Sequence, residues 1–341
     1  MKALKLTLGV GALALATWWA LTESSDRYRA LDETDIAYAG VVVNTPDPER
    51  LARFYLDTFG GERLSATEEN AEIRLRTPGY EGRGPTLTLR RVAAGSGQGP
   101  LRAQDHGYAH ICFEADDVPG LTRRIRANGG TLLSRFDTPH IEPGIYALDP
   151  DGNVIEGHLP FATPLTPRTI LRTLNSLLRT VLDLAPPSDD RVRFLHVNIN
   201  SANWERTARF YEAAFDARPT GFQRDYQGSY ISQLTGVEGA AVRGRHVALP
   251  GYSEGGPTFE IFSYNQSPTQ GPLGIDDLGR VMTEFTVRDL DAIEARVVEA
   301  GGTSIERQRP NSSLVADADG NLILLRRAER VTPALQPGDT P

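Results

Sequence analysis

Short apolar runs alternate with amphipathic helical patterns along most of the chain, and this alternation occurs four times. Each unit opens with an apolar run typical of a strand, continues through a turn into a helix, and ends in two or three further strands. The pattern therefore predicts four βαβββ modules. Their opening strands are predicted at residues 40–44, 109–115, 195–200 and 282–287.

The helix of each module carries an apolar stripe at helical spacing. The first helix is expected to begin near Pro48, because proline is favoured at the first helical position. The second and fourth helices each run into a Gly-Gly pair, which is typical of a helix end. The second, third and fourth helices are predicted over residues 118–128, 206–215 and 290–297.

Longer phrases recur in the same order along the chain. Residues 49–55 read Glu-Arg-Leu-Ala-Arg-Phe-Tyr, and residues 205–211 read Glu-Arg-Thr-Ala-Arg-Phe-Tyr. Asp-Pro-Asp-Gly-Asn at 149–153 likewise recurs as Asp-Ala-Asp-Gly-Asn at 317–321. These matches indicate two related halves of two modules each. The predicted domains are residues 30–160 (modules 1 and 2) and 191–328 (modules 3 and 4).

The first 29 residues are expected to lie outside the modules. Lys2 and Lys5 precede an apolar run from Leu6 to Leu21, a pattern typical of a signal peptide or a signal-anchor. We favour an uncleaved anchor in the membrane, with the body exported outside the cytoplasm. Cleavage would instead give a periplasmic or secreted protein.

Residues 161–190 are predicted to contain an amphipathic linker helix with a continuous apolar stripe between Ile170 and Leu182. Packing of this helix on a module is favoured, and a helix lying on the membrane surface is the alternative. Residues 329–341 are predicted to form a disordered tail.

Composition narrows the range of functions. The chain has 40% hydrophobic and 23% charged residues, which is ordinary for a globular protein. Its net charge of −8 argues against a nucleic-acid partner. A single cysteine, Cys112, rules out an intramolecular disulfide and any zinc site that needs two or more cysteines. A small-molecule substrate is the expected partner, and a homodimer is compatible with the sequence.

The modules and their phrases resemble the vicinal oxygen chelate superfamily, which includes glyoxalases, bleomycin-resistance proteins and extradiol dioxygenases. The resemblance rests on His-Val-Asn-Ile at 196–199, on the repeated helix phrase, and on Asp-Pro-Asp-Gly-Asn-Val-Ile-Glu ending at Glu156. It covers residues 36–160 and 191–327. It implies an α+β fold in which four βαβββ modules form two cupped mixed sheets, accompanied here by the N-terminal hydrophobic helix and the linker helix.

The resemblance also implies two metal-ligand positions in each module, one on the first strand and one on the last. In module 2 they fall on His110 and Glu156, and in module 3 on His196 and Glu260. In modules 1 and 4 they fall on residues unsuited to a hard metal, namely Gly40, Thr88, Met282 and Leu324.

The distribution of these residues predicts how the modules pair. If neighbouring modules paired, each cup would hold one histidine and one glutamate, too few for a tight site. If module 2 pairs with module 3 and module 1 with module 4, one cup holds all four ligands and the other none. We expect the second arrangement, which tandem glyoxalases of this superfamily show, although an exchanged dimer would also complete the site.

Two imidazoles and two carboxylates suit one divalent ion, such as Ni, Co, Zn, Mn or Fe. Glu156 and Glu260 lie in apolar strand contexts, where a carboxylate is costly unless it is paired or metal-bound. They are the candidate catalytic groups for moving a proton. Strand alternation and proximity suggest further residues lining the pocket: Cys112, His158, Asn198, Phe262 and Tyr264. Three histidines match no ligand position and are interpreted as surface residues or residues behind the ligands: His106, His140 and His246.

Three functions remain open. The first is a metal-dependent isomerase or lyase of glyoxalase or epimerase type acting on a small oxygenated substrate. The second is an Fe(II) extradiol-type dioxygenase, although that group typically uses two histidines and one glutamate. The third is a non-catalytic, resistance-type protein that binds a small molecule. The four-residue set favours the first function, whereas export argues against a cytosolic glutathione adduct as the substrate.

Overall fold

The computed structural model describes residues 29–67, 71–94, 102–136, 144–160, 192–329 and 331, with parts of 170–182. The predicted N-terminal anchor and most of the linker and tail lie outside this set. No helix among the described residues is long and apolar enough to cross a membrane. Export and membrane anchoring therefore stay predictions from the sequence.

Modules 1 and 4 form one eight-stranded mixed sheet, the 1–4 sheet, with its strands antiparallel across the module boundary. In spatial order its strands are β14 (Thr303–Arg309), β15 (Ser312–Ala316), β16 (Leu322–Arg327), β13 (Gly279–Val287), β1 (Ile36–Thr45), β4 (Thr86–Arg91), β3 (Glu72–Arg76) and β2 (Glu62–Ala66).

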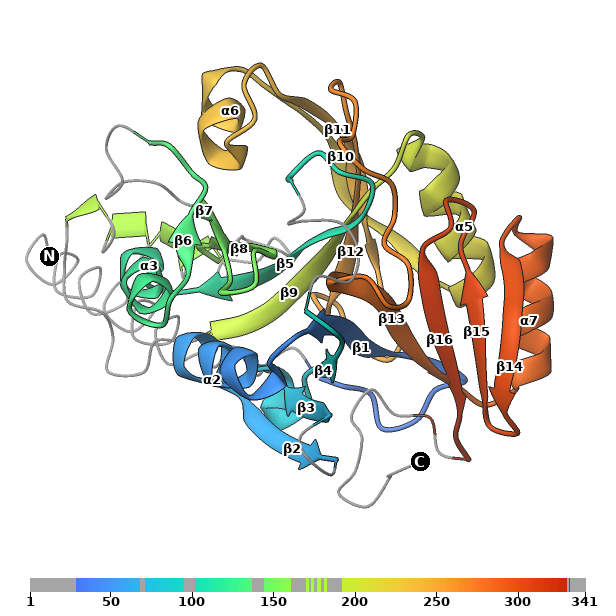
Figure 1. Ribbon diagram of the computed structural model, residues 1–341. Coiled ribbons are helices and arrows are strands. Elements are labelled where there is room, and N and C mark those ends of the chain that lie inside the picture. The colour runs from blue at the N-terminus through green and yellow to red at the C-terminus, as the bar shows by residue number, and fades with distance from the viewer. Residues whose placement is uncertain are drawn as a thin grey trace, which may run out of the picture.

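Modules 2 and 3 form a second eight-stranded sheet, the 2–3 sheet, in the same way (Figure 1). Its order is β10 (Arg218–Gln227), β11 (Ala241–Ala248), β12 (Thr258–Tyr264), β9 (Val192–Asn200), β5 (Gly107–Ala115), β8 (Val154–His158), β7 (Gly144–Leu148) and β6 (Thr131–Leu132). The predicted α+β fold of two cupped sheets and the predicted pairing of modules are both confirmed within one chain.

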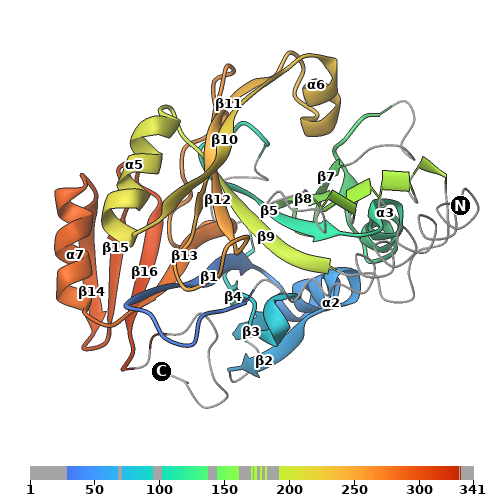
Figure 2. The ribbon, with the colours of Figure 1, turned by 180° about the vertical axis from the view of Figure 1, so that it is seen from behind.

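Each module contributes one helix that begins at an Asx cap. The cap side chains of Asp47, Asp117, Asn203 and Asp289 each accept a hydrogen bond from the backbone N–H three residues later, which satisfies one free donor of the first turn. The helices are α2 (Pro48–Phe59), α3 (Val118–Ala127), α5 (Trp204–Phe215) and α7 (Leu290–Glu299). In Figures 1 and 2, α2 lies beside α3 and α5 beside α7.

Two short helical elements were not predicted. The 3-10 turn η3 (Tyr80–Gly82) precedes β4 in module 1, and α6 (Ser229–Thr235) lies between β10 and β11 in module 3. The Ser134 hydroxyl donates a 2.7 Å hydrogen bond to the Leu234 carbonyl, so α6 is joined to module 2. This insertion accounts for part of the extra length of the second half.

Aromatic packing makes one continuous core beneath both sheets. Phe59 of α2 stacks on Phe113 of β5 with ring centroids 3.9 Å apart, and Phe215 of α5 stacks on Phe285 of β13 at 4.3 Å. Each of these helices therefore packs against the sheet of the other modules as well as against strands of its own module. Helix packing joins module 1 to module 2 and module 3 to module 4, whereas strand pairing joins the modules in the other combination.

The two repeated phrases bind each other. The hydroxyl of Tyr55, in the first helix phrase, donates a 3.0 Å hydrogen bond to the carboxylate of Asp149, in the first Asp-Gly-Asn phrase. Tyr211 and Asp317 make the same 3.0 Å bond in the second half. These bonds link modules within each half of the chain, which explains why both phrases recur together.

The predicted segment boundaries fit the described residues only in part. Val331 is buried and bridges to Thr34, so the ordered fold extends into the segment predicted as a disordered tail. In the linker, several described residues are helical, but the expected packing of its apolar stripe is not seen for them. The exposed members of this stripe are Ile170, Leu174, Leu177, Leu178, Val181 and Leu182.

We expect Tyr55→Phe to lower the free energy of unfolding by about 1–2 kcal/mol, because it leaves the buried Asp149 carboxylate without this donor. Tyr38→Phe is the matched control. Tyr38 is fully buried, and its hydroxyl has no hydrogen-bond partner among the residues that the structure describes. Its removal should leave stability unchanged or raise it. Urea unfolding of both variants checks this, and equal losses would contradict the role given to the tyrosine–aspartate bond.

Candidate metal centre

The four predicted ligands lie on the four central strands of the 2–3 sheet. β5 and β9 run antiparallel, and Cys112 pairs with His196 while His110 pairs with Asn198. The two histidines therefore face the same side from adjacent strands, one diagonal step apart. β8 places Glu156 beside Cys112, and β12 places Glu260 beside Asn198, so each glutamate flanks the central pair from the outside.

The side chains converge on one small volume. The Nε2 atoms of His110 and His196 are 3.3 Å apart. Glu156 Oε2 lies 3.1 Å from Nε2 of His110 and 3.0 Å from that of His196, and the corresponding distances from Glu260 Oε2 are 3.5 and 3.4 Å. Both histidines are buried, and the two glutamate side chains are only 12% and 10% exposed.

This geometry fits a divalent ion. Ligands bound about 2.1 Å from one ion lie roughly 3.0–3.4 Å from their neighbours, which is close to the spacing seen here. Two nearly buried carboxylates on a shared site also carry a charge that a cation would balance. His110, Glu156, His196 and Glu260 would hold such an ion. Two nitrogen and two oxygen donors leave the choice among Ni, Co, Zn, Mn and Fe open.

The ionisation of these groups is strongly coupled. Burial alone would raise the pKa of Glu156, but hydrogen bonds from His110 and His196 outweigh it and hold the pKa below its usual range. Burial alone would also raise the pKa of Glu260. The charge on His196 and hydrogen bonds from the surrounding imidazoles outweigh it and hold this pKa well below its usual value. Burial would lower the pKa of His196, but the two carboxylates raise it to about 9. The site thus holds a proton that a metal ion would displace.

Two residues lie behind the ligands: His246, which the sequence left as either a surface residue or a residue behind the ligands, and Tyr146, to which it gave no role. His246 pairs with Glu260 across β11 and β12, and its Nε2 lies 3.1 Å from Glu260 Oε1 while its Nδ1 lies 2.9 Å from the Thr258 hydroxyl. Tyr146 occupies the equivalent place in module 2, opposite Glu156, with its ring 4.9 Å from that of His110. Both residues could have been found from the sequence by aligning the antiparallel strand next to each glutamate, since His246 and Tyr146 lie directly opposite Glu260 and Glu156. His106 is not part of the cluster, and His140 lies outside the described residues.

The predicted pocket residues surround this centre. The Asn198 amide donates to the carboxylate and the carbonyl of Glu260 at 3.2 and 3.1 Å. Phe262 and Tyr264 share the face of β12 that carries Glu260 and pack with a small apolar cluster around Ile231. Burial raises the pKa of Tyr264, and the charges of the two nearby glutamates raise it further.

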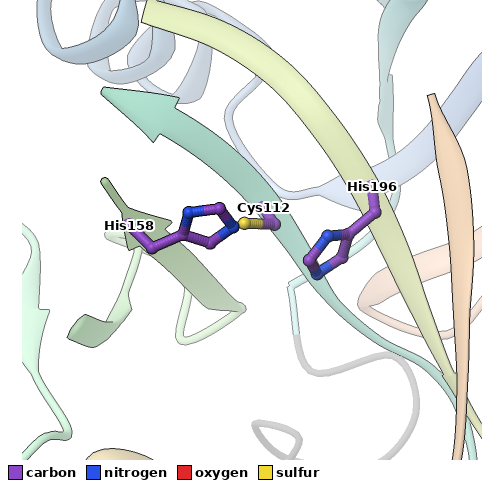
Figure 3. A group of neighbouring side chains, drawn as sticks. All are labelled: Cys112, His158 and His196. Carbon is purple, nitrogen blue, oxygen red and sulfur yellow. The ribbon is translucent and has the colours of Figure 1, made fainter. Parts of the chain in front are cut away.

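Cys112 and His158 form a second group with His196 (Figure 3). One ligand atom from each of the three lies within 4.8 Å of the others, and all three side chains are buried. Burial and then the two glutamates raise the pKa of Cys112 well above its usual value, so it is a thiol at neutral pH without a metal. This group offers three donors, whereas the group of His110, Glu156, His196 and Glu260 offers four. The four-residue group is therefore the better metal site.

Two family models match the chain. Residues 37–156 match the glyoxalase/bleomycin resistance protein/dioxygenase superfamily, and residues 196–325 match a glyoxalase-like domain. Together they span well over half of the sequence. The chain belongs to the glyoxalase/bleomycin resistance/dioxygenase superfamily.

Solved structures of this superfamily share the tandem fold. Glyoxalase I from Zea mays is 16% identical, covers 86% of this chain and 92% of its own, and superposes with a TM-score of 0.55. A putative dioxygenase from Bacillus subtilis subsp. subtilis str. 168 is 12% identical, covers 87% and 86%, and has a TM-score of 0.51. No curated protein matches the sequence. At these identities the likeness establishes the fold and leaves the reaction to be argued from the site.

We expect the purified protein to bind about one divalent ion per chain. His110→Ala and His196→Ala should each abolish stoichiometric binding, because the four ligand atoms form one site across two modules. His106→Ala is the control and should retain the ion. Elemental analysis after dialysis measures the content. Retention of the ion in either ligand variant would contradict a shared site.

In chelator-treated protein, we expect stability to fall as the pH rises from about 6.5 to about 9. The pKa of His196 is about 6.5 when the chain is unfolded and is raised to about 9 in the fold. The stabilisation is therefore fully present below the lower value and lost as the pH passes the upper one. Thermal unfolding across this range measures the slope. His196→Gln, which cannot take up the proton, should flatten it, and an unchanged slope would refute the assignment to His196.

Proposed function

We propose that this protein is a metal-dependent isomerase or lyase of glyoxalase or epimerase type, acting on a small oxygenated substrate. The observation that carries the proposal is the buried set of two histidines and two glutamates whose ligand atoms meet at one point. The site has a base on each side of that point, and proton transfer on a carbonyl compound is the chemistry that such an arrangement suits.

The two glutamates are not held equally. Glu260 accepts from the Asn198 amide at 3.2 Å and lies 3.1 Å from His246, in addition to the two histidine ligands. At the place equivalent to Asn198, module 2 has Cys112, whose thiol is a weaker donor to Glu156. At the place equivalent to His246 it has Tyr146. Glu156 is thus the carboxylate that can move more readily, and we assign it the role of base.

The reaction needs only proton transfers. A divalent ion bound in the cup would polarise a substrate carbonyl and lower the energy of the enediolate that forms. For an isomerisation, Glu156 removes a proton from the hydroxyl-bearing carbon beside that carbonyl and returns it to the former carbonyl carbon, while the hydroxyl proton passes to the former carbonyl oxygen. For an epimerisation, Glu156 removes the proton from one face of the carbon and Glu260, on the other side of the site, delivers a proton to the opposite face. Neither requires an oxidant or a reductant.

Burial supports the same assignment. Glu156 and Glu260 are nearly enclosed, and Cys112 and Tyr146 close the site from β5 and β7. Exclusion of water strengthens the interactions with a charge that develops on the substrate. Such a site favours a small molecule whose oxygen atoms are close together, because two positions on an octahedral ion would remain after four protein ligands.

A dioxygenase is the second candidate, supported by the shared fold with a protein described as a putative dioxygenase. It fits the site less well. Oxygen and a bidentate catechol together need three positions, whereas four protein ligands leave two on a six-coordinate ion. A binding protein without catalysis is the third candidate, and the four-residue set is more than such a protein requires.

Proton exchange tests the proposal. The metal-loaded protein is incubated in D2O with hemithioacetals of methylglyoxal and with small α-hydroxyketones, and product and deuterium are followed by NMR. We expect Glu156→Gln to lower turnover by about 100-fold or more, because the base is lost while an oxygen ligand remains. Glu260→Gln at saturating metal is the matched control and should retain more activity.

The outcomes separate the candidates. Greater loss in Glu260→Gln would move the role of base to Glu260 and leave the reaction class intact. Oxygen uptake with a catechol in the Fe(II)-loaded protein, without exchange on carbonyl compounds, would instead establish the dioxygenase. Saturable binding of a small molecule without proton exchange and without oxygen uptake would instead support the non-catalytic binding protein.

A further inference from the structure

The 1–4 sheet has a cup of its own, here called the second cup, with a cavity of about 290 Å³. The strand register places Gly40, Thr88, Met282 and Leu324 at the positions equivalent to the four metal ligands, as the sequence predicted. This cup therefore cannot hold a metal in the manner of the 2–3 sheet. The volume lies near the lower end of ligand pockets, about 300–1,000 Å³.

One wall of the second cup is apolar. Met282 of β13, Leu314 of β15, Leu324 of β16 and Val42 of β1 are all buried and pack together, with Ile275 partly buried beside them. These side chains line the cavity together with charged and polar residues: Glu72, Thr88, Arg90, Glu284 and Arg326. The cup thus offers an apolar surface next to a charged one, which suits an amphipathic small molecule.

The charged side carries a positive excess. Glu284 is 1% exposed and is already neutralised, because Arg74 Nη2 lies 3.3 Å from both of its oxygens and Arg326 Nη2 lies 3.0 Å from one. Arg74 also pairs with Glu72 at 3.4 Å. Arg74 does not line the cavity itself, but its guanidinium and those of Arg90 and Arg326 make three against the two carboxylates of Glu72 and Glu284, which leaves one positive charge.

Arg90 carries that excess charge. Its guanidinium is held by neutral acceptors, the Asn44 side chain at 2.9 Å and the Ile275 carbonyl. The nearest carboxylate that pairs with it, Asp276, is 3.9 Å away and 86% exposed, so solvent weakens the pair. Arg90 is thus fixed in position at the cavity while its charge remains poorly compensated.

An unsatisfied hydroxyl marks the same cavity. Thr88 is 1% exposed and lines the second cup, and its Oγ1 has no hydrogen-bond partner among the described residues. A buried hydroxyl without a partner costs free energy, and a bound ligand would supply the missing partner. This observation is independent of the charge count, and it points to a polar ligand atom two residues from Arg90 on the same face of β4.

We propose that the second cup binds a small carboxylate with an apolar body, separately from the metal centre. The carboxylate accepts hydrogen bonds from Arg90 and Thr88, and the apolar body covers Met282, Leu314 and Leu324. A single negative charge balances the single positive excess. The site does not depend on the metal or on the reaction proposed for the 2–3 sheet.

Methionine methyl signals test the proposal directly. The chain contains two methionines, Met1 and Met282, and Met282 lines the second cup. Full-length protein labelled with ¹³C at the methionine methyl groups is titrated with hexanoate, and Met282→Leu assigns the signal. We expect the Met282 signal to shift and saturate while the Met1 signal stays in place. Hexanamide, which keeps the chain but lacks the charge, should bind at least about tenfold more weakly.

Three variants complete the test. Arg90→Gln should weaken hexanoate binding about tenfold, because a charge-assisted hydrogen bond is lost. Thr88→Val should weaken it about threefold without lowering the unfolding midpoint, because the hydroxyl has no partner in the protein to lose. His110→Ala should bind hexanoate as the natural chain does. Absence of a saturable Met282 shift, equal binding of hexanamide, or unchanged affinity in Arg90→Gln would each overturn the proposal.

Discussion

The antiparallel pairing of β5 with β9 is the interaction on which the metal centre depends. Each of modules 2 and 3 supplies one histidine and one glutamate, which is half of a site. The register that sets Cys112 opposite His196 directs His110 and His196 to the same side of the sheet. Because side chains alternate along a strand, a slip of one residue would turn one of these histidines to the opposite face and leave two incomplete halves.

Two kinds of contact secure that register by connecting the modules in different combinations. Strand pairing joins module 2 to 3 and module 1 to 4, whereas the Tyr55–Asp149 and Tyr211–Asp317 bonds join the modules within each half. Every module is therefore held by two others. Neither sheet can be completed by one half of the chain alone, which makes the described modules one interdependent unit although the sequence divides into two family domains.

The sequence predicted the module order and the helices from short phrases that repeat, and it predicted the four candidate ligands from the resemblance to a known superfamily. It left His246 as either a surface residue or a residue behind the ligands, and it gave Tyr146 no role. His246 and Tyr146 reach the site through the register of hairpin strands, and that register depends on loop lengths that differ between modules 2 and 3. The contact between Arg74 and Glu284 joins residues 210 positions apart, and no local sequence pattern predicts it. The helix α6 likewise has no counterpart at the same place among the described residues of the other modules.

Both cups contain buried carboxylates, and the two differ in the group that compensates the negative charge. A carboxylate buried in a cup needs a compensating positive charge. In the 2–3 sheet a cation held by the four-residue set would supply that charge, whereas in the 1–4 sheet Arg74 and Arg326 pair with Glu284. The cups are also physically joined. Arg280, two residues before Met282, donates from β13 to the carbonyls of Tyr108 and Ala109, the residues that precede His110. The 1–4 sheet thus supports the strand that carries His110 although its own equivalent positions hold no metal-ligand residues.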